Sequence, residues 1–359
     1  MRIAYITRSD FGAMGEAAIL NYVNIVSKKH KVLVVEHPRG ESIVSPKPKG
    51  VQFVSPPKGR LDDQLLFLYK TLSEFKPDIV HLIQSPHCFD YILHIQHLIP
   101  NSRWIIDFRS PHVGPLDSPI LKKFSSLQFL VHAIFTHSMP SLKTNIKWRF
   151  KRAYHVPPGV NISSIKQSER NNFLPKKFIY IGSLAKTRKV DLLIEWFAHF
   201  RKNSTIEAEL HVYGTGNTAD ELKKVVKDKS LDGFIKFYGS LPQMELWKLI
   251  ANYDAGLAYV PLESFSSAPS LKSIEYIAAK LPVFTSKTPG HIDFSKQYNV
   301  KFHYFENNKD SFNNEISAFC SKPVNEKELT ANHKNIQCLD WEYIVENKVE
   351  KIYNKLSPK

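Results

Sequence analysis

Cysteine is scarce in this chain, whose 359 residues contain only Cys88, Cys320 and Cys338. Three cysteines cannot all pair, and their spacing fits no metal site, so the sequence carries neither a disulfide framework nor a zinc module. Free thiols suit a reducing compartment, and we expect a cytoplasmic protein. Long apolar runs are lacking too, since none approaches the roughly 18 residues that span a bilayer. Met1–Ile6 leads directly into an expected strand, so we expect no signal peptide.

Acidic residues are outnumbered, because 34 Asp and Glu stand against 49 Lys and Arg and give a formal net charge of +15. A nucleic acid is one partner that such a charge suits, but zinc spacing, an arginine-rich arm and RNA-recognition signatures are all missing, so we expect no nucleic acid partner. An anionic membrane is another. In Leu142–Arg152 basic residues alternate with Ile, Trp and Phe. This pattern fits a peripheral contact with a headgroup layer, at the inner face of the membrane, or a helix with a solvated basic face.

Short apolar strands alternate with helical stretches in two successive halves, which predicts parallel strands joined by crossover helices. Pro157-Pro158-Gly159 breaks the pattern between the halves. We expect an α/β fold of two Rossmann-like domains facing a cleft, at 1–160 and 177–338, with a linker at 161–176 and a helix at 339–359 that packs back on the first domain. The expected strands are Ile3–Ile6, Lys31–Val35, Asp78–Ile83, Arg103–Ile106, Ala133–Thr136, Tyr154–Val156, Lys177–Ile181, Glu209–Tyr213, Ile235–Tyr238, Ala255–Ala258 and Val283–Phe284.

The stretch Ser270–Ala279, closed by Pro282-Val283, predicts a loop, a short helix and a buried strand. A helix start presents free N–H groups and a partial positive charge, so it is a natural seat for phosphate. Lys272 adds a positive charge where the helix dipole disfavours one, which makes sense if an anion binds there. Glu275, about one turn further, is placed to accept hydrogen bonds from ribose hydroxyls. The alternative is an amphipathic helix whose Lys272 and Glu275 form a solvated pair.

Segments from both halves resemble one family, the retaining GT-B glycosyltransferases of family 4, also called glycosyl transferases group 1. The second half carries the closer matches, which keep the order and the spacing of the family's motifs. The first half agrees more loosely. The matching segments are Val212–Gly216, Phe237–Pro242, Tyr253–Pro261 and Ser270–Ala279 in the second half, and Pro77–His81, Trp104–His112 and Val156–Asn161 in the first. The resemblance implies the GT-B architecture and sugar transfer from a nucleotide diphosphate donor with retention, usually without a metal; no cofactor is expected beyond this co-substrate.

The reaction implied by the resemblance needs cations and backbone N–H groups where charge grows on the leaving diphosphate. The family uses an Arg directly after the Gly of a Gly-x-Leu turn and a Lys six residues after that Gly. Here the Gly is Gly182, Ser183 stands at the Arg position, and Arg188 stands at the Lys position, followed by Lys189. Lys186 or Lys189 could supply the second charge, because Ser183 cannot. The alternative is that these basic residues belong to a solvated turn.

A second departure concerns the acid that contacts the donor sugar in many members, eight residues before the position of Glu275. Ser267 stands there, and Glu263 lies four residues earlier, which we interpret as an altered contact with the donor sugar. His112 is a candidate for contacting the reacting sugar, although a lone histidine is more often structural. Gly12 and Gly15 could let the backbone approach the diphosphate, or form an ordinary strand–helix turn. The expected catalytic residues are Arg188, Lys189 and His112; the expected donor-binding residues are Gly15, Gly182, Gly214, Leu241, Ser267, Ser270, Leu271, Lys272 and Glu275; no metal site is expected.

The resemblance therefore predicts a retaining glycosyltransferase that moves a sugar from a UDP- or GDP-linked donor to a glycan or lipid-linked acceptor in cell-envelope polysaccharide or glycoconjugate synthesis. Ser183 and Ser267 leave a second hypothesis open, a non-catalytic sugar-nucleotide-binding partner subunit. The net charge leaves an electrostatic nucleic-acid binder as a third, and a sugar-nucleotide epimerase of similar architecture is a fourth.

Overall fold

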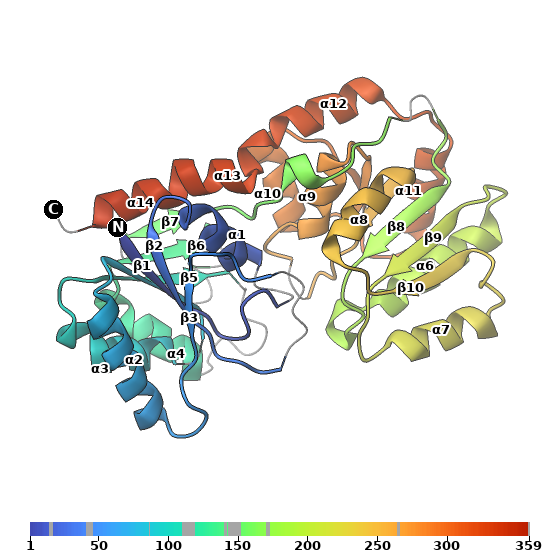
Figure 1. The fold of residues 1–359 in the computed structure, drawn as a ribbon. Coiled ribbons are helices and arrows are strands. Elements are labelled where there is room, and N and C mark those ends of the chain that lie inside the picture. The colour runs from blue at the N-terminus through green and yellow to red at the C-terminus, as the bar shows by residue number, and fades with distance from the viewer. Residues whose placement is uncertain are drawn as a thin grey trace. The chain divides into compact units, whose positions relative to one another are not determined.

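The structure is a computed structural model of the 359-residue chain. It describes residues 1–13, 17–40, 46–85, 87–109, 119–139, 142, 152–169, 173–263 and 266–357. The chain divides into unit 1, Met1–Gly159 with Trp341–Lys359, and unit 2, Val160–Asp340. Each unit is built on one parallel sheet with helices on both faces, so the α/β class and the two Rossmann-like sheets are confirmed (Figure 1). Within the described ranges no helix is long and apolar enough to cross a bilayer.

The seven strands of unit 1 lie in the order β3-β2-β1-β4-β5-β6-β7. The chain starts in the middle of this sheet, moves outward in one direction and then continues from the other side of β1, so the order reverses between β1 and β4. Each strand pairs in parallel with its neighbours, as crossover connections require. The strands are β1 Arg2–Ile6, β2 Lys31–Val35, β3 Gln52–Val54, β4 Ile79–Ile83, β5 Arg103–Phe108, β6 Ala133–Thr136 and β7 Ala153–His155.

Helices of unit 1 cover the sheet because each has an apolar stripe at helical spacing. Ile19, Tyr22 and Val23 of α1, for example, pack into one core cluster with strand residues of β1 and β2. Several of the helices continue into short 3₁₀ turns. The elements are α1 Ala17–Val26, α2 Leu61–Phe75, α3 Cys88–Ile95 with η1 Gln96–Leu98, and α4 Pro119–Leu127 with η2 Gln128–Leu130.

The last helical segment of the chain belongs to unit 1 and consists of α13 Trp341–Ile344, η7 Val345–Val349 and α14 Glu350–Leu356. The sequence predicts one α-helix over this range, whereas the structure has a π-helical turn at η7. Near the end of the segment, the hydroxyl of Tyr353 lies 2.6 Å from Nδ1 of His81 in β4. A buried polar contact therefore reinforces the apolar packing of this segment on the sheet.

The six strands of unit 2 lie in the order β10-β9-β8-β11-β12-β13, all parallel. The first strand of the unit, β8, is again central, and the order reverses between β8 and β11. Loops that leave these two strands diverge to opposite sides of the sheet, which opens a place for a ligand at their carboxyl ends. The strands are β8 Lys177–Ile181, β9 Glu209–Tyr213, β10 Ile235–Gly239, β11 Ala255–Ala258, β12 Val283–Ser286 and β13 His303–Phe305.

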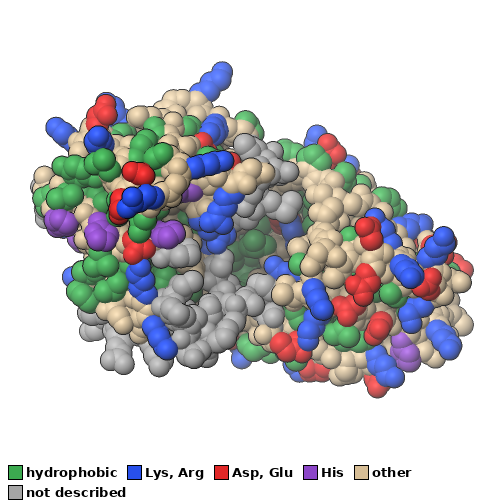
Figure 2. Space-filling view, turned by 90° about the horizontal axis from the view of Figure 1, so that it is seen from below, with side chains coloured by type: hydrophobic (Ala, Val, Ile, Leu, Met, Phe, Trp, Pro, Cys, Tyr) green, Lys and Arg blue, Asp and Glu red, His purple; other side chains and the backbone are tan. Residues whose placement is uncertain are grey.

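Two apolar clusters lie on the two faces of the unit 2 sheet. One includes Phe178, Phe197 and Phe312, and the other includes Ile179, Ile274 and Phe294. On its outer surface, Lys and Arg side chains are interspersed with Asp and Glu over the face seen in Figure 2. The helices and turns are η3 Ile162–Ser164, η4 Lys186–Arg188, α6 Val190–Asn203, α7 Ala219–Asp228, α8 Gln243–Leu249, η5 Ile250–Asn252, α9 Leu271–Ala278, α10 Pro289–Tyr298, α11 Lys309–Cys320, α12 Glu326–Asn335 and η6 Gln337–Leu339.

The expected linker at 161–176 lies inside unit 2. Ile162 and Ile165 are buried in one of its core clusters, and the backbone N–H of Lys176 donates to the carboxylate of Asp254 at 2.9 Å. The polar composition of the segment predicts a linker, but its two buried isoleucines anchor it to the core of unit 2. The described part of this segment is therefore packed against the domain that follows it.

Candidate functional site

The candidate site of unit 2 lies at the carboxyl ends of its strands, where the strand order reverses between β8 and β11. Most of the residues predicted from the sequence lie on the loops that follow these two strands and their neighbours. Gly182, Arg188 and Lys189 follow β8, Gly214 follows β9, and Leu241 follows β10. The described residues of the loop after β11 lead through Ser267 to Ser270 and the start of α9.

Backbone contacts between glycines interlock the loops after β8 and β9 with the end of β10. Gly214 has a φ of +148°, and a Cβ at this position would lie 1.8 Å from the carbonyl oxygen of Gly182. The Gly214 N–H donates to the carbonyl of Gly239 at 2.8 Å. Gly239 itself has a φ of +73°. Glycine is required at position 214 because no side chain fits there. Gly239, which contacts it, was not among the site residues predicted from the sequence.

The start of α9 is ordered by its own serines. Ser270 is the N-cap residue, and its hydroxyl accepts the N–H of Lys272 at 3.3 Å. The hydroxyl of Ser273 donates back to the Ser270 carbonyl at 2.6 Å. The side chain of Leu271 is exposed beside this cap. The predicted loop and short helix are confirmed, and the two serine hydroxyls help to order the helix start.

Lys272 and Glu275 form an ion pair within α9, with 2.8 Å between Nζ and Oε2. The Glu275 side chain is only 6% exposed and that of Lys272 is 26% exposed. The pair is therefore not the solvated surface pair that the sequence left open. A cation held at a helix start and a carboxylate one turn further could contact, respectively, a phosphate and a hydroxyl of one ligand.

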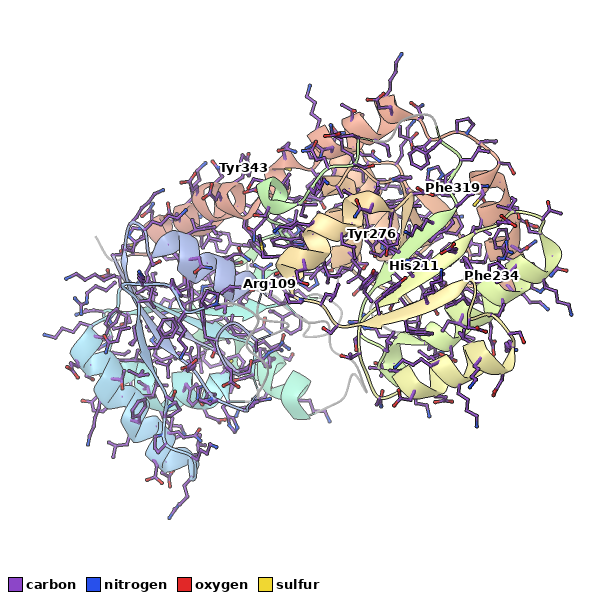
Figure 3. The ribbon with its side chains drawn as sticks, turned by 45° about the vertical axis from the view of Figure 1, so that its right-hand side comes forward. Arg109, His211, Phe234, Tyr276, Phe319 and Tyr343 are labelled. Carbon is purple, nitrogen blue, oxygen red and sulfur yellow. The ribbon has the colours of Figure 1, made fainter. Side chains whose placement is uncertain are left out.

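Tyr276 joins α9 to the end of β8. Its hydroxyl accepts the backbone N–H of Ile181 at 3.1 Å. Its ring lies where a Cβ on Gly256 would come within 2.1 Å, so the helix approaches β11 closely because that position has no side chain. Figure 3 shows Tyr276 reaching from α9 toward the strands of the sheet. Because Tyr276 follows Glu275 and Ile181 precedes Gly182, this contact brings the acid and the glycine turn into the same region.

The turn after β8 carries the predicted cations. Lys189 has a φ of +47°, and its Nζ lies 2.9 Å from Oε1 of Glu263 in the loop after β11. This hydrogen bond lowers the pKa of Glu263. Burial raises the pKa of Tyr180 to about 12, and the positive charge of Arg188 opposes that rise, which indicates that Arg188 lies near Tyr180. The loops on the two sides of the strand reversal are thus joined by an ion pair.

The remaining residues predicted from the sequence either pack in a core or lie outside the described residues. Leu241 is partly buried and packs against the core cluster on the α9 side of the sheet. Gly15 and His112 lie outside the described residues, as does the interior of Leu142–Arg152. Leu142 itself is fully buried in unit 1. Among the described residues, no group of three or more His, Cys, Asp or Glu could hold a metal ion.

Known proteins resemble this chain in the sequence of unit 2 and in overall fold. Residues 161–336 match the model of the family described as glycosyl transferases group 1. A poly(ribitol-phosphate) alpha-N-acetylglucosaminyltransferase of Staphylococcus aureus (strain COL) is 29% identical over 133 residues, which cover 34% of this chain and 25% of that protein. The matched part thus spans about a quarter of the length of this curated relative.

Solved structures share the fold along nearly the whole chain. A glycosyltransferase from Rickettsia africae ESF-5 superposes with a TM-score of 0.78 at 13% identity, covering 99% of this chain and 98% of the other. Anabaena Alr3699/HepE in complex with UDP and glucose superposes with a TM-score of 0.73 at 15% identity, covering 99% of this chain and 100% of the other. The chain has the GT-B fold, and its residues 161–336 belong to the glycosyl transferases group 1, a family of glycosyltransferase enzymes.

Proposed function

We propose that the chain binds a UDP-linked sugar at the carboxyl edge of the unit 2 sheet and transfers the sugar, with retention, to a glycan or lipid-linked acceptor in cell-envelope synthesis. The observation that carries this proposal is the capped start of α9 with its half-buried Lys272–Glu275 pair, tied to the end of β8 beside Gly182. The structure of HepE with UDP and glucose supports uridine as the base.

The donor would be held by complementary groups. Its diphosphate would lie at the start of α9 and against the glycine turns, where backbone can approach because Gly182 and Gly214 carry no side chain. Glu275 would exchange its bond to Lys272 for the ribose hydroxyls, and Lys272 would turn to the diphosphate. Arg188 and Lys189 would then stabilise the charge that grows on the leaving group.

The transfer would proceed by attack on the same face of the sugar. The bond between the anomeric carbon and the phosphate oxygen breaks, a bond to the acceptor oxygen forms, and the acceptor proton passes to the leaving phosphate. UDP is the second product. No acidic nucleophile is needed for this route.

The acceptor would be negatively charged or lie at a negatively charged surface. The net charge of +15 favours such a partner, and the curated relative is named for a phosphate polymer. The alternating basic and apolar residues of 142–152 favour a lipid-linked acceptor at the inner face of the membrane. Vesicles containing anionic lipid should bind the wild type more strongly than a variant with charge reversals at Lys147, Arg149 and Lys151. Equal binding of the two would exclude this role for the segment.

Calorimetric titration with UDP, GDP and ADP tests the donor site. We expect micromolar binding of UDP that is lost in Glu275→Ala and kept in the control Glu221→Ala, an exposed acid on α7. A sugar screen with UDP-linked donors would then show slower UDP release in Arg188→Ala. Unchanged UDP binding in Glu275→Ala would contradict the assigned site.

A non-catalytic sugar-nucleotide-binding subunit is the second candidate function. Ser183 and Ser267 favour it, because both positions lack the charged groups of the family pattern. Tight UDP binding without turnover of any UDP-sugar across a broad acceptor panel would select this candidate. Release of UDP that depends on an acceptor would exclude it.

A further inference from the structure

His291 lies at the start of α10 with a fully buried side chain, and it contacts the loop that leads into α9. Its Nδ1 is 3.0 Å from the carbonyl oxygen of Ser286, and its Nε2 is 3.2 Å from the backbone nitrogen of Ser270. A carbonyl oxygen only accepts, so the ring proton belongs on Nδ1. Nε2 then offers a lone pair, and the Ser270 N–H donates to it.

The imidazole can play this part only in its neutral form, because a protonated ring would present a second N–H to the Ser270 N–H. Burial keeps it neutral by lowering the pKa of His291 to about 4. The hydroxyl of Thr285 packs against the same ring, 3.1 Å from Nδ1, while donating to the carbonyl of Ala258 at 2.6 Å. The ring is therefore fixed in both tautomer and orientation.

The start of α10 holds the same loop at a second point. The N–H of Gly290 donates to the carbonyl of Ser266 at 2.8 Å. A Cβ on Gly290 would lie 2.4 to 2.6 Å from backbone atoms of Ala268, so the loop rests directly on this helix. Gly290 and His291 together hold both ends of the loop segment from Ser266 to Ser270.

The contact between His291 and Ser270 matters because Ser270 is the N-cap residue of α9. Its hydroxyl caps Lys272 N, and its carbonyl receives the Ser273 hydroxyl, so any movement of Ser270 moves the start of α9. Lys272 and Glu275 lie on the first turns of that helix. An error of about 1 Å in such a site can cost a factor of about 100 in rate.

We propose that His291 is a positioning residue, which accepts the Ser270 N–H and thereby holds the start of α9 in the geometry that receives the diphosphate and ribose of the donor. The expected effect of His291 on UDP affinity rests on the proposed function of this site. Its expected effect on the order of the start of α9 rests only on the contacts described above.

Two substitutions of similar length separate positioning from packing. His291→Gln keeps an acceptor oxygen near the position of Nε2, whereas His291→Met fills the space without a comparable acceptor. Calorimetry with UDP should give the Gln variant an affinity within a few-fold of the wild type, and the Met variant an affinity about 10- to 100-fold lower. Equal affinities of the wild type and both variants would overturn the proposal.

Hydrogen exchange measures the order of the start of α9 without a ligand. Amides of 266–276 should exchange faster in His291→Met than in the wild type and His291→Gln, while amides of the control helix α7 stay unchanged. Equal acceleration in both regions would mean a general loss of stability and would overturn the proposal. If the wild type failed to bind UDP but the exchange difference remained, the proposed function would fall and the positioning of α9 would stand.

Discussion

Tyr276 and Ile181, 95 positions apart in the sequence, are joined by a buried hydrogen bond of 3.1 Å from the Ile181 N–H to the Tyr276 hydroxyl. Tyr276→Phe would leave this N–H without that partner, and we expect the free energy of unfolding to fall by about 1–3 kcal/mol. Urea denaturation measures the change. Tyr343→Phe is the matched control, because Tyr343 is 47% exposed, and its effect should stay within about 0.5 kcal/mol. Similar values for the two variants would show that the buried bond contributes little.

Gly214→Ala should be severely destabilising. The new Cβ would lie 1.8 Å from the Gly182 carbonyl oxygen, in a backbone conformation with a φ of +148°. Relieving the overlap requires a shift of one of two interlocked loops, so we expect a loss of at least about 1–3 kcal/mol together with loss of UDP affinity. Thermal unfolding and calorimetry are the measurements.

Gly233→Ala is the control for that substitution, since a Cβ at Gly233 meets nothing within 4 Å. It should leave the melting temperature and the UDP affinity nearly unchanged. A Gly214→Ala variant that behaved like Gly233→Ala would contradict the close approach of the two loops.

The order of elements could be read from the sequence, because buried parallel strands appear as apolar runs and the crossover helices as amphipathic stretches. All eleven expected strands are present, with ends that move by at most one or two residues. The strands β3 Gln52–Val54 and β13 His303–Phe305 were missed. Each has three residues at the edge of its sheet, too few to show a periodic pattern.

The site could be predicted only in part, for a related reason. Gly214, Lys272 and Glu275 lie in contiguous motifs whose chemistry is visible locally. His291 acts on Ser270 from 21 positions away, and Lys189 reaches Glu263 across the strand reversal. Such contacts depend on which strands become neighbours, so a local pattern could place the two partners on the same edge of the sheet but could not pair them.

Acid should destabilise the protein partly through His291. Its pKa is lowered to about 4 in the folded protein from an ordinary value of 6.5, because burial disfavours the charged form. The unfolded chain therefore binds more protons than the folded one between these values, and stability falls as pH drops through that window. At pH 4 we expect this histidine alone to cost about 3 kcal/mol.

Unfolding free energies measured between pH 7 and 4 in the wild type and in His291→Gln test this prediction. The glutamine cannot titrate, so its stability should fall less steeply with pH. Parallel curves would show that His291 does not contribute to the acid sensitivity.

Arg109 should be indispensable to unit 1, because it neutralises a fully buried carboxylate. Its Nε lies 2.7 Å from Oδ1 of Asp107, whose side chain is 0% exposed, and Figure 3 shows Arg109 within the unit. Burial by itself raises the pKa of Asp107, but the charge and hydrogen bond of Arg109, together with the contact of His81, outweigh that effect and hold the pKa below its ordinary value. The same guanidinium donates to the carbonyls of Val156 at 3.0 Å and Pro157 at 3.2 Å, just before the chain leaves the unit.

Arg109→Met would leave Asp107 charged and without this partner, and we expect a loss of about 3–5 kcal/mol in the free energy of unfolding. Arg109→Met combined with Asp107→Asn should recover part of the loss, because the amide carries no charge. Asp107→Asn alone should be destabilising as well, since it leaves Arg109 without its counter-charge. A double variant no more stable than Arg109→Met would assign the cost to the lost carbonyl contacts of Val156 and Pro157 rather than to the buried charge. Urea denaturation of the wild type and the three variants, analysed as a double-mutant cycle, therefore separates the two contributions.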